Sequence, residues 1–288
     1  MPLFAVSLLV CGAFIHALWN LLLKSSQHKV AFMWWALFVG TIGYGAILVW
    51  TTPLIISQTL WPILILSGLA ETGYALTLTH SYDDGDLSQV YPISRGSAPI
   101  FIVLWSGLFL NERLPWVGYA GIALIVGGIY LASLPDRREF FQPLRALDRR
   151  PAQWALAAGL FISIYSVVDK VGVGLAGPWV YNLYAFAVMT ALLAPYVWQQ
   201  RERSATCAEW RAHWPRIVLA GAMVTGNYVL VLWALSLTRA SYVGAVRGVS
   251  VIFGAAFGWL LLKESLGLSR LVAAGLMFAG IACLSLAK

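Results

Sequence analysis

The chain contains 288 residues, of which 60% are hydrophobic and 11% are charged, and its mean hydropathy is +0.78. Because about a quarter of the residues of a soluble domain are charged, this composition excludes an ordinary soluble protein and predicts an all-α membrane protein. The net charge of +7 does not indicate a nucleic-acid partner, since the lysines and arginines lie mainly in short loops between apolar segments.

The apolar segments follow one another along the chain, and each has about the 20 residues that a membrane-crossing helix needs. The charged stretch 135–151 falls in the middle, and we interpret it as a linker between a first repeat, 1–134, and a second, 152–288. With an odd number of spans in each half, the second half enters the membrane from the opposite side. The sequence therefore predicts ten transmembrane helices in two inverted five-helix repeats. The ten predicted spans are 3–23, 30–50, 60–80, 87–110, 115–134, 152–170, 178–198, 215–237, 241–262 and 266–286.

The loop charges predict the orientation. Thirteen lysines and arginines lie in the odd-numbered loops, whereas the opposite side carries only Arg113, Arg239 and Lys288. By the positive-inside rule, the side with the odd-numbered loops is cytoplasmic and both termini lie outside.

The first span carries a polar face. His16, Trp19 and Asn20 are spaced at i, i+3 and i+4, which places them on one side of a helix. Such a face in a membrane either forms hydrogen bonds with a neighbouring helix or lines a substrate cavity.

The third span carries Glu71 among apolar residues. A carboxylate there costs about 2.5–3.5 kcal/mol on insertion scales unless it is paired or protonated. Two roles remain open, and they are compatible. Glu71 binds and releases a proton, or it is the counter-ion of Arg95 in the next span.

The fourth span carries Arg95 between Tyr91-Pro92 and Ala98-Pro99. Each proline removes a backbone donor and is expected to kink or break the helix. Free carbonyl groups around a buried charge indicate a binding site in a transporter.

The stretch around Arg95 is repeated 152 residues later, where Arg247-Gly248 corresponds to Arg95-Gly96 and Glu264 to Glu112. The 17 residues from arginine to glutamate span about 25 Å as a helix, most of a bilayer core. Elsewhere the repeat is looser. At a shift of 153 residues Glu71 falls over Val224, so only one half has the acidic group.

The adjacent Asp169 and Lys170 fall at the end of the sixth predicted span. We expect a solvated pair there, with long side chains reaching the membrane surface.

These motifs together resemble the drug/metabolite transporter superfamily, in its ten-span EamA-type branch. The resemblance covers the whole chain through its duplication. It implies two inverted five-helix bundles around a central cavity and the transport of small metabolites, amino acids, sugar phosphates, drugs or lipid-linked sugars, in several members as export. It implies neither a particular substrate nor a catalytic residue. The residues that carry it are His16-Ala17-Leu18-Trp19-Asn20, the stretch from Gly85 to Gly96, Leu110-Asn111-Glu112-Arg113-Leu114, and the second copy in Arg247-Gly248-Val249-Ser250 and Leu262-Lys263-Glu264.

We therefore expect a secondary transporter of the inner or plasma membrane that moves a small polar, anionic metabolite as the two halves rock. Arg95 and Arg247 would bind the anionic group, and Glu71 and His16 would balance charge or carry a proton. The alternatives are a flippase for lipids or lipid-linked sugars and an exporter of lipophilic drugs. The other residues expected to shape the pocket are Trp19, Asn20, Tyr74, Tyr91, Tyr165, Asn227 and Tyr228.

An enzyme is not expected. The four histidines and three cysteines form no metal-ligand spacing, and the sequence shows no glycine-rich phosphate loop or nucleophile motif. We accordingly expect no cofactor and no metal. Since the duplication supplies both halves of a pore, the expected state is a monomer or a weak dimer.

Overall fold

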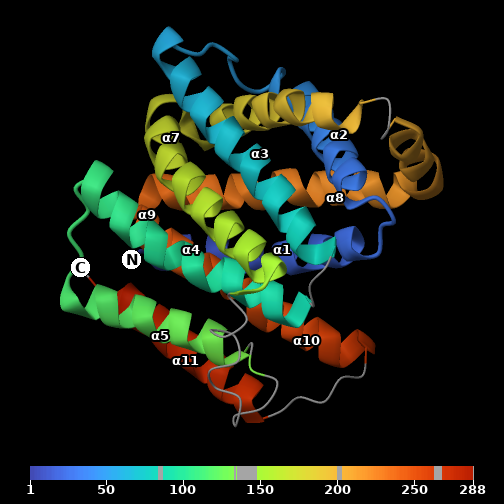
Figure 1. Ribbon diagram of the computed structural model, residues 1–288. Helices are drawn as coiled ribbons and strands as arrows, with labels where there is room; N and C mark the ends of the chain where they lie inside the picture. Colours follow the sequence, from blue (N-terminus) through green and yellow to red (C-terminus); the bar gives the residue numbers. More distant parts are fainter. Residues whose placement is uncertain (84–86, 133, 135–147, 200–202, 263–267, 288) are drawn as a thin grey trace.

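The computed structural model describes residues 1–83, 87–132, 134, 148–199, 203–262 and 268–287. Within these ranges the chain is built of helices and contains no strand, which confirms the predicted all-α class (Figure 1). The elements are α1 (Leu3–Lys24), α2 (Lys29–Leu48), the short helix η1 (Gln58–Leu60), α3 (Trp61–Asp83), α4 (Leu87–Phe109), α5 (Trp116–Ala132), α7 (Arg150–Val197), α8 (Arg203–Leu237), α9 (Ala240–Arg247), α10 (Ser250–Leu262) and α11 (Leu268–Leu286).

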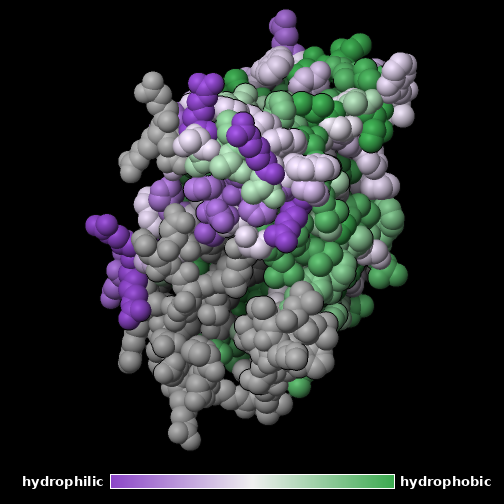
Figure 2. Space-filling view, turned by 90° about the vertical axis from the view of Figure 1, so that its right-hand side faces the viewer, coloured by the Kyte–Doolittle hydropathy of each residue, from purple (hydrophilic) through white to green (hydrophobic). Residues whose placement is uncertain are grey.

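Among the described residues, 4 helices are long and apolar enough to cross a membrane, namely α1, α2, α7 and α8. Shorter apolar helices cover Ile93–Phe109, Trp116–Ala132, Ala240–Gly254 and Leu271–Leu286. Large apolar side chains also lie on the surface, such as Trp50 and Trp116, each 88% exposed. In Figure 2 hydrophobic side chains cover one part of the visible face, and hydrophilic ones gather in a band beside it. These features suit a protein surrounded by lipid.

The two longest helices are bent. α7 bends at Gly177, whose φ of 71° and ψ of 163° lie outside the helical region, and Pro178 follows directly. The bend divides α7 into the parts 150–176 and 178–197. α8 bends at His213, two residues before Pro215. The straight parts coincide with predicted spans, but the first part of α7 runs six residues beyond the predicted end at 170.

The arginine-containing helices differ from the prediction. α4 is one continuous helix from Leu87 to Phe109 and does not break at its prolines, whereas the expected kink stays a prediction. The break occurs instead in the second copy. There α9 ends at Arg247, and α10 begins at Ser250 after a short turn. A helix that ends in the protein interior leaves backbone carbonyl groups without helical partners.

The helices pack as crossing pairs: α3 against α7, α5 against α11, α2 against α8, α4 against α7 and α1 against α8. Figure 1 shows α5 and α11 side by side at one edge of the bundle. Their backbones touch, since a Cβ added at Gly280 would lie 2.6 Å from the carbonyl oxygen of Gly121. Gly40 and Gly221 likewise allow the backbones of α2 and α8 to touch where these helices cross. Small residues thus permit the close helix contacts.

Candidate functional site

A small cavity lies at the centre of the bundle, where α1, α2, α3, α7, α8 and α9 meet. Its volume is about 60 Å³, well below the roughly 300–1,000 Å³ of most small-molecule sites. The structure therefore holds the site in a contracted form. Eight of the eleven site residues predicted from the sequence line this cavity: His16, Trp19, Glu71, Tyr74, Tyr165, Asn227, Tyr228 and Arg247.

The first arginine lies beside the cavity, in α4. The buried Arg95 guanidinium contacts Nε2 of His16 in α1 and donates a hydrogen bond of 3.2 Å to the hydroxyl of Tyr74 in α3. The Arg95 Cζ atom is also 6.0 Å from the centre of the Tyr74 ring, within the range of a cation–π interaction. Arg95 is thus aimed from α4 at the helices on either side of the cavity.

His16 has a donor at each of its ring nitrogens. Arg95 lies at Nε2, and the indole N–H of Trp19 donates to Nδ1 at 3.2 Å. A neutral imidazole has one accepting and one donating nitrogen, so neither tautomer can accept from both neighbours.

The second arginine repeats the arrangement in the other half of the chain. Arg247 of α9 donates a hydrogen bond of 3.2 Å to the hydroxyl of Tyr165 in α7, and its Cζ is 5.7 Å from the ring centres of Tyr165 and of Tyr228 in α8. Arg95 reaches the first and third helices of the chain, and Arg247 reaches the corresponding helices of the second half. Among the described residues no carboxylate forms an ion pair with Arg247.

Glu71 is buried at the cavity wall, with 3% of its surface exposed. Its Oε2 atom has no hydrogen-bond partner among the described atoms. The described residues include no ion pair between Glu71 and Arg95. The expected counter-ion role is therefore wrong, because Arg95 is directed toward His16 and Tyr74 instead.

Asp169 corrects a second expectation. It is completely buried, not solvated, and accepts hydrogen bonds from the Ser67 hydroxyl at 2.5 Å, from the Tyr181 hydroxyl at 2.7 Å and from Tyr228. The prediction failed because α7 continues to the bend at Gly177, so that Asp169 lies two turns inside the helix. The apolar residues 171–176 after Lys170 were the signal in the sequence that could have shown this.

Asn20 does not line the cavity in the described part of the structure. The Asn20 amide donates to the backbone carbonyl of His16 at 2.7 Å, as expected for a residue that stabilises its own helix. The side chain of Tyr91 lies outside the described part of the structure.

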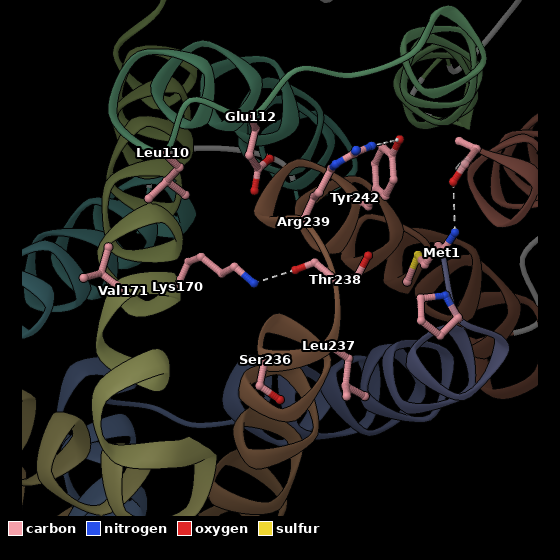
Figure 3. A pocket seen from close by; sticks show the side chains of 12 residues that line it. Met1, Leu110, Glu112, Lys170, Val171, Ser236, Leu237, Thr238, Arg239 and Tyr242 are labelled. Carbon is pink, nitrogen blue, oxygen red and sulfur yellow. Dashed lines mark hydrogen bonds between the residues drawn. The ribbon is translucent and has the colours of Figure 1, made fainter.

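A larger pocket of about 710 Å³ opens at the end of the bundle where Met1 and Ala287 lie (Figure 3). Lys170 extends into it and donates to the carbonyl oxygens of Leu235 at 2.5 Å and Thr238 at 2.9 Å. Arg239 donates to the Tyr242 hydroxyl at 3.0 Å. Two cationic side chains therefore face this pocket, which we call the vestibule.

Glu112 is the one described carboxylate that lines the vestibule. It accepts hydrogen bonds from the backbone N–H groups of Ala240 at 2.7 Å and Ser241 at 3.3 Å. It thereby caps the start of α9, a position that favours a negative charge. This contact explains the glutamate in the repeated motif as a structural link between α4 and α9.

A third cavity, of about 490 Å³, is a groove along α3, α4 and α7 with an almost wholly apolar wall. Trp105 and Phe109 form part of this wall, and Leu110 and Val171 line both the groove and the vestibule. The central cavity does not share a residue with the groove.

Comparison with known proteins decides the class. A family model described as "EamA-like transporter family" matches residues 3–134 and 150–286, nearly the whole chain. The chain belongs to this family. The EamA-like protein is therefore a membrane transporter and not an enzyme.

Two relatives with known names extend the comparison. The EamA-like chain is 24% identical to the pseudopaline exporter CntI of Pseudomonas aeruginosa over 229 residues, which cover 79% of this chain and 75% of the exporter. It is 31% identical over 85 residues to an uncharacterized transporter in the cobO 3' region of a Sinorhizobium species, covering 30% of this chain and 60% of that protein.

A solved structure supports the fold. A crystal structure described only as that of a protein matches the EamA-like chain with a TM-score of 0.74 at 15% identity, covering 99% of this chain and 98% of the other. At this identity the match shows the fold alone.

Proposed function

We propose that the chain is a secondary transporter of the cell (inner) membrane that exports a small polar, anionic metabolite by alternating access. The observation that carries this proposal is the paired placement of Arg95 and Arg247 at one central cavity, each from its own half of the chain and each against a tyrosine ring. The guanidinium groups of Arg247, in the cavity wall, and of Arg95, against the lining residues His16 and Tyr74, favour a carboxylate or phosphate group as ligand.

The proposed architecture is ten spans in two inverted repeats, 1–134 and 152–288. It is supported by the bends in α7 and α8 and by the two separate segments of the family match. The backbone nitrogen of Met1 donates to the carbonyl oxygen of Leu284 at 3.0 Å, so both ends of the described chain lie at one end of the bundle. An even number of spans has this property.

Alternating access would proceed between the central cavity and the vestibule. The central cavity is contracted to about 60 Å³, whereas the vestibule of about 710 Å³ is open. In the orientation that the loop charges favour, the vestibule faces outward. The cationic Lys170 and Arg239 would then receive the anion as it leaves the central site.

Export is the direction we propose, supported by the name of the Pseudomonas relative. The same path works in reverse if the gradient is reversed, so the direction depends on the coupling ion. Glu71 and His16 are the groups at the cavity that would balance the charge of the substrate or bind a proton. One chain contains both halves of the path, which suits a monomer or a weak dimer.

The second candidate is a flippase for lipids or lipid-linked sugars, which the apolar groove of about 490 Å³ along α3, α4 and α7 favours. A lipid tail in this groove would reach the vestibule through the shared Leu110 and Val171. The central arginines would take no part in that reaction.

Transport by the purified protein in liposomes tests the proposal. The labelled probes are succinate, glutamate and glycerol 3-phosphate, with tetraphenylphosphonium as the lipophilic cation and a fluorescent phospholipid for flippase activity. We expect at least one anion to be transported by the wild type and not by Arg247→Gln. Arg216→Gln, at an exposed position of α8, is the matched control. Transport of only the phospholipid or only the cation would reject the anion proposal.

A further inference from the structure

Asp169 is the most completely enclosed carboxylate at the centre of the bundle. None of its surface is exposed, and no lysine, arginine or histidine in the described chain forms an ion pair with it. Lys170, the next residue, points away into the vestibule. A buried carboxylate without a paired cation is costly in a membrane protein, and such residues mark ion or proton pathways.

Three hydroxyl groups surround this carboxylate, and we call them with Asp169 the hydroxyl cage. Ser67 comes from α3, Tyr181 from the second part of α7 and Tyr228 from α8, while Asp169 itself lies in the first part of α7. Gly172 leaves room for the cage, because a Cβ at this position would lie 2.8 Å from Cδ2 of Tyr181. Each hydroxyl supplies one proton, so the cage suits an ionised carboxylate that accepts all three bonds.

Tyr228 connects the hydroxyl cage to the central cavity. Its hydroxyl donates a hydrogen bond to Asp169, and Tyr228 itself lines the central cavity. Glu71 lines the cavity and has an oxygen without a hydrogen-bond partner among the described atoms. Tyr228 therefore joins the hydroxyl cage to the cavity wall, on which Glu71 also lies.

We propose that Asp169 binds the proton that is coupled to transport, an inference that rests on the secondary transport proposed above. A protonated Glu71 gives its proton to the hydroxyl oxygen of Tyr228, and Tyr228 gives its own proton to Asp169. Glu71 becomes ionised, Asp169 becomes neutral and Tyr228 is unchanged, so the number of protons is conserved. The proton thereby moves from the cavity wall into the hydroxyl cage.

The spacing of the oxygens favours a proton over a metal cation. Ser67 and Tyr181 place their oxygens 2.5 and 2.7 Å from Oδ1 of Asp169, which are hydrogen-bond distances. A bound cation would lie about 2.0–2.6 Å from each oxygen and so would separate the oxygens by about 3 Å or more.

Protonation of Asp169 would change the contacts at the wall of the central cavity. The proton arrives at Oδ2 through Tyr228, so the Tyr228 hydroxyl turns to accept from the neutral acid, while Ser67 and Tyr181 go on donating to Oδ1. Because Tyr228 of α8 lines the central cavity, this change couples proton binding at Asp169 to the proposed substrate site.

Several other charged or titratable groups lie near Glu71 and Asp169 and influence the pH at which these carboxyl groups bind a proton. Arg247 of α9 lines the same cavity as Glu71 and Tyr228. His16 of α1 and Arg95 of α4 lie across the cavity. The experiment therefore has to assign the proton to Asp169 itself by substitution.

Infrared spectroscopy of the purified protein during a pH titration is the test. The wild type is expected to gain a carboxylic acid carbonyl band as the pH falls, and Asp169→Asn is expected to lack one component of it. Ser67→Ala, which removes one donor, is expected to shift the pH at which that component appears. Thr190→Val, in α7 like Asp169, removes a hydroxyl that donates to the carbonyl oxygen of Phe186 in the same helix, and this control is expected to match the wild type. An unchanged band in a folded Asp169→Asn protein would overturn the proposal. If this variant does not fold, the Ser67→Ala protein decides: an Asp169 band that appears at the same pH as in the wild type would overturn the proposal.

Transport separates this inference from the proposed function. A pH gradient across the liposome membrane is expected to accelerate transport by the wild type. For Asp169→Asn the factor of acceleration is expected to be at least tenfold smaller, whereas Thr190→Val keeps the wild-type factor. A variant with full acceleration would overturn the coupling role of Asp169 while the transport proposal stands. A wild type that transports none of the anionic probes would instead reject the proposed function, and the infrared titration would still decide whether Asp169 binds a proton.

Discussion

The rings of Tyr74 and Tyr165 meet at the centre of the molecule, with their centres 5.9 Å apart. Each ring carries an arginine of its own half, since Arg95 lies against Tyr74 and Arg247 against Tyr165. This contact joins the two arginine sites into one cavity wall. The predictions below follow from it and from the packing around it.

Replacement of Arg95 by alanine is expected to abolish transport while the protein still inserts into the membrane. A hydrogen bond from a guanidinium to a charged group contributes about 1.5–3 kcal/mol, which corresponds to roughly a 10- to 150-fold loss of affinity. Transport and membrane insertion are measured in the same liposomes. Undiminished transport by a fully inserted Arg95→Ala protein would remove Arg95 from the binding site.

The Tyr165 hydroxyl is expected to orient Arg247. Tyr165→Phe removes the acceptor 3.2 Å from the guanidinium but keeps the ring under it. We expect a loss of affinity for the transported anion of about three- to tenfold, in line with one hydrogen bond. Tyr196→Phe, a tyrosine near the end of α7 and away from the cavity, is the control. Equal affinities of the two variants would contradict the orienting role.

Lys170 is expected to guide the anion through the vestibule. Lys170→Met keeps much of the side-chain volume and removes the charge. Transport is expected to become several-fold slower at low ionic strength and to depend less on salt, because a long-range charge effect is screened by ions. Rates at low and at high salt measure this. A salt dependence equal to that of the wild type would show that the vestibule charge has no part in transport.

The bend of α7 is expected to need glycine. Gly177 has a positive φ of 71° and no atom near the position of a Cβ, so Gly177→Ala creates backbone strain without a clash. The expected cost is about 1–2 kcal/mol. Gly174→Ala is the matched control, because this glycine is helical and equally open, and alanine favours a helix. Thermal unfolding in detergent should give a lower midpoint for Gly177→Ala only. A lower midpoint for both would point to a different cause.

The contact between α5 and α11 can be tested in the same way. Gly280→Ala brings a Cβ to 2.6 Å from the carbonyl oxygen of Gly121, so the helices must move apart. We expect a destabilisation of about 1–3 kcal/mol. The equivalent change at Gly275, which has open space around it on the same helix, is expected to be neutral or stabilising. A midpoint of unfolding as low for Gly275→Ala as for Gly280→Ala would contradict this packing.

Much of the helical arrangement could be predicted from the sequence, because hydrophobic segments and the repeated arginines are local patterns. The positions of α1, α2 and α5 follow from their apolar residues, and both arginines were expected near a cavity. The break after Arg247 and the continuous α4 could not be predicted in this way. Helix breaks in a membrane depend on which neighbours satisfy the backbone, and the prolines of α4 alone do not decide that.

Asp169 shows why part of the site was missed. Its partners Ser67 and Tyr228 are 102 and 59 residues away along the chain. The burial of Asp169 also depends on the continuation of α7 past Lys170 to the bend at Gly177, whereas the predicted span ended at residue 170. The supposed pair of Glu71 and Arg95 failed for a related reason. Opposite charges in adjacent spans do not fix which way two side chains point.

Thermal stability of the purified protein with added anions tests most directly whether the two arginines form an anion site. A ligand that binds only the folded state raises the unfolding temperature by mass action. We expect a carboxylate or phosphate ester to raise the midpoint of the wild type and of Arg216→Gln, and to leave the midpoints of Arg95→Ala and Arg247→Gln unchanged. Equal stabilisation of all four proteins, or stabilisation by lipids or lipophilic cations alone, would contradict the account.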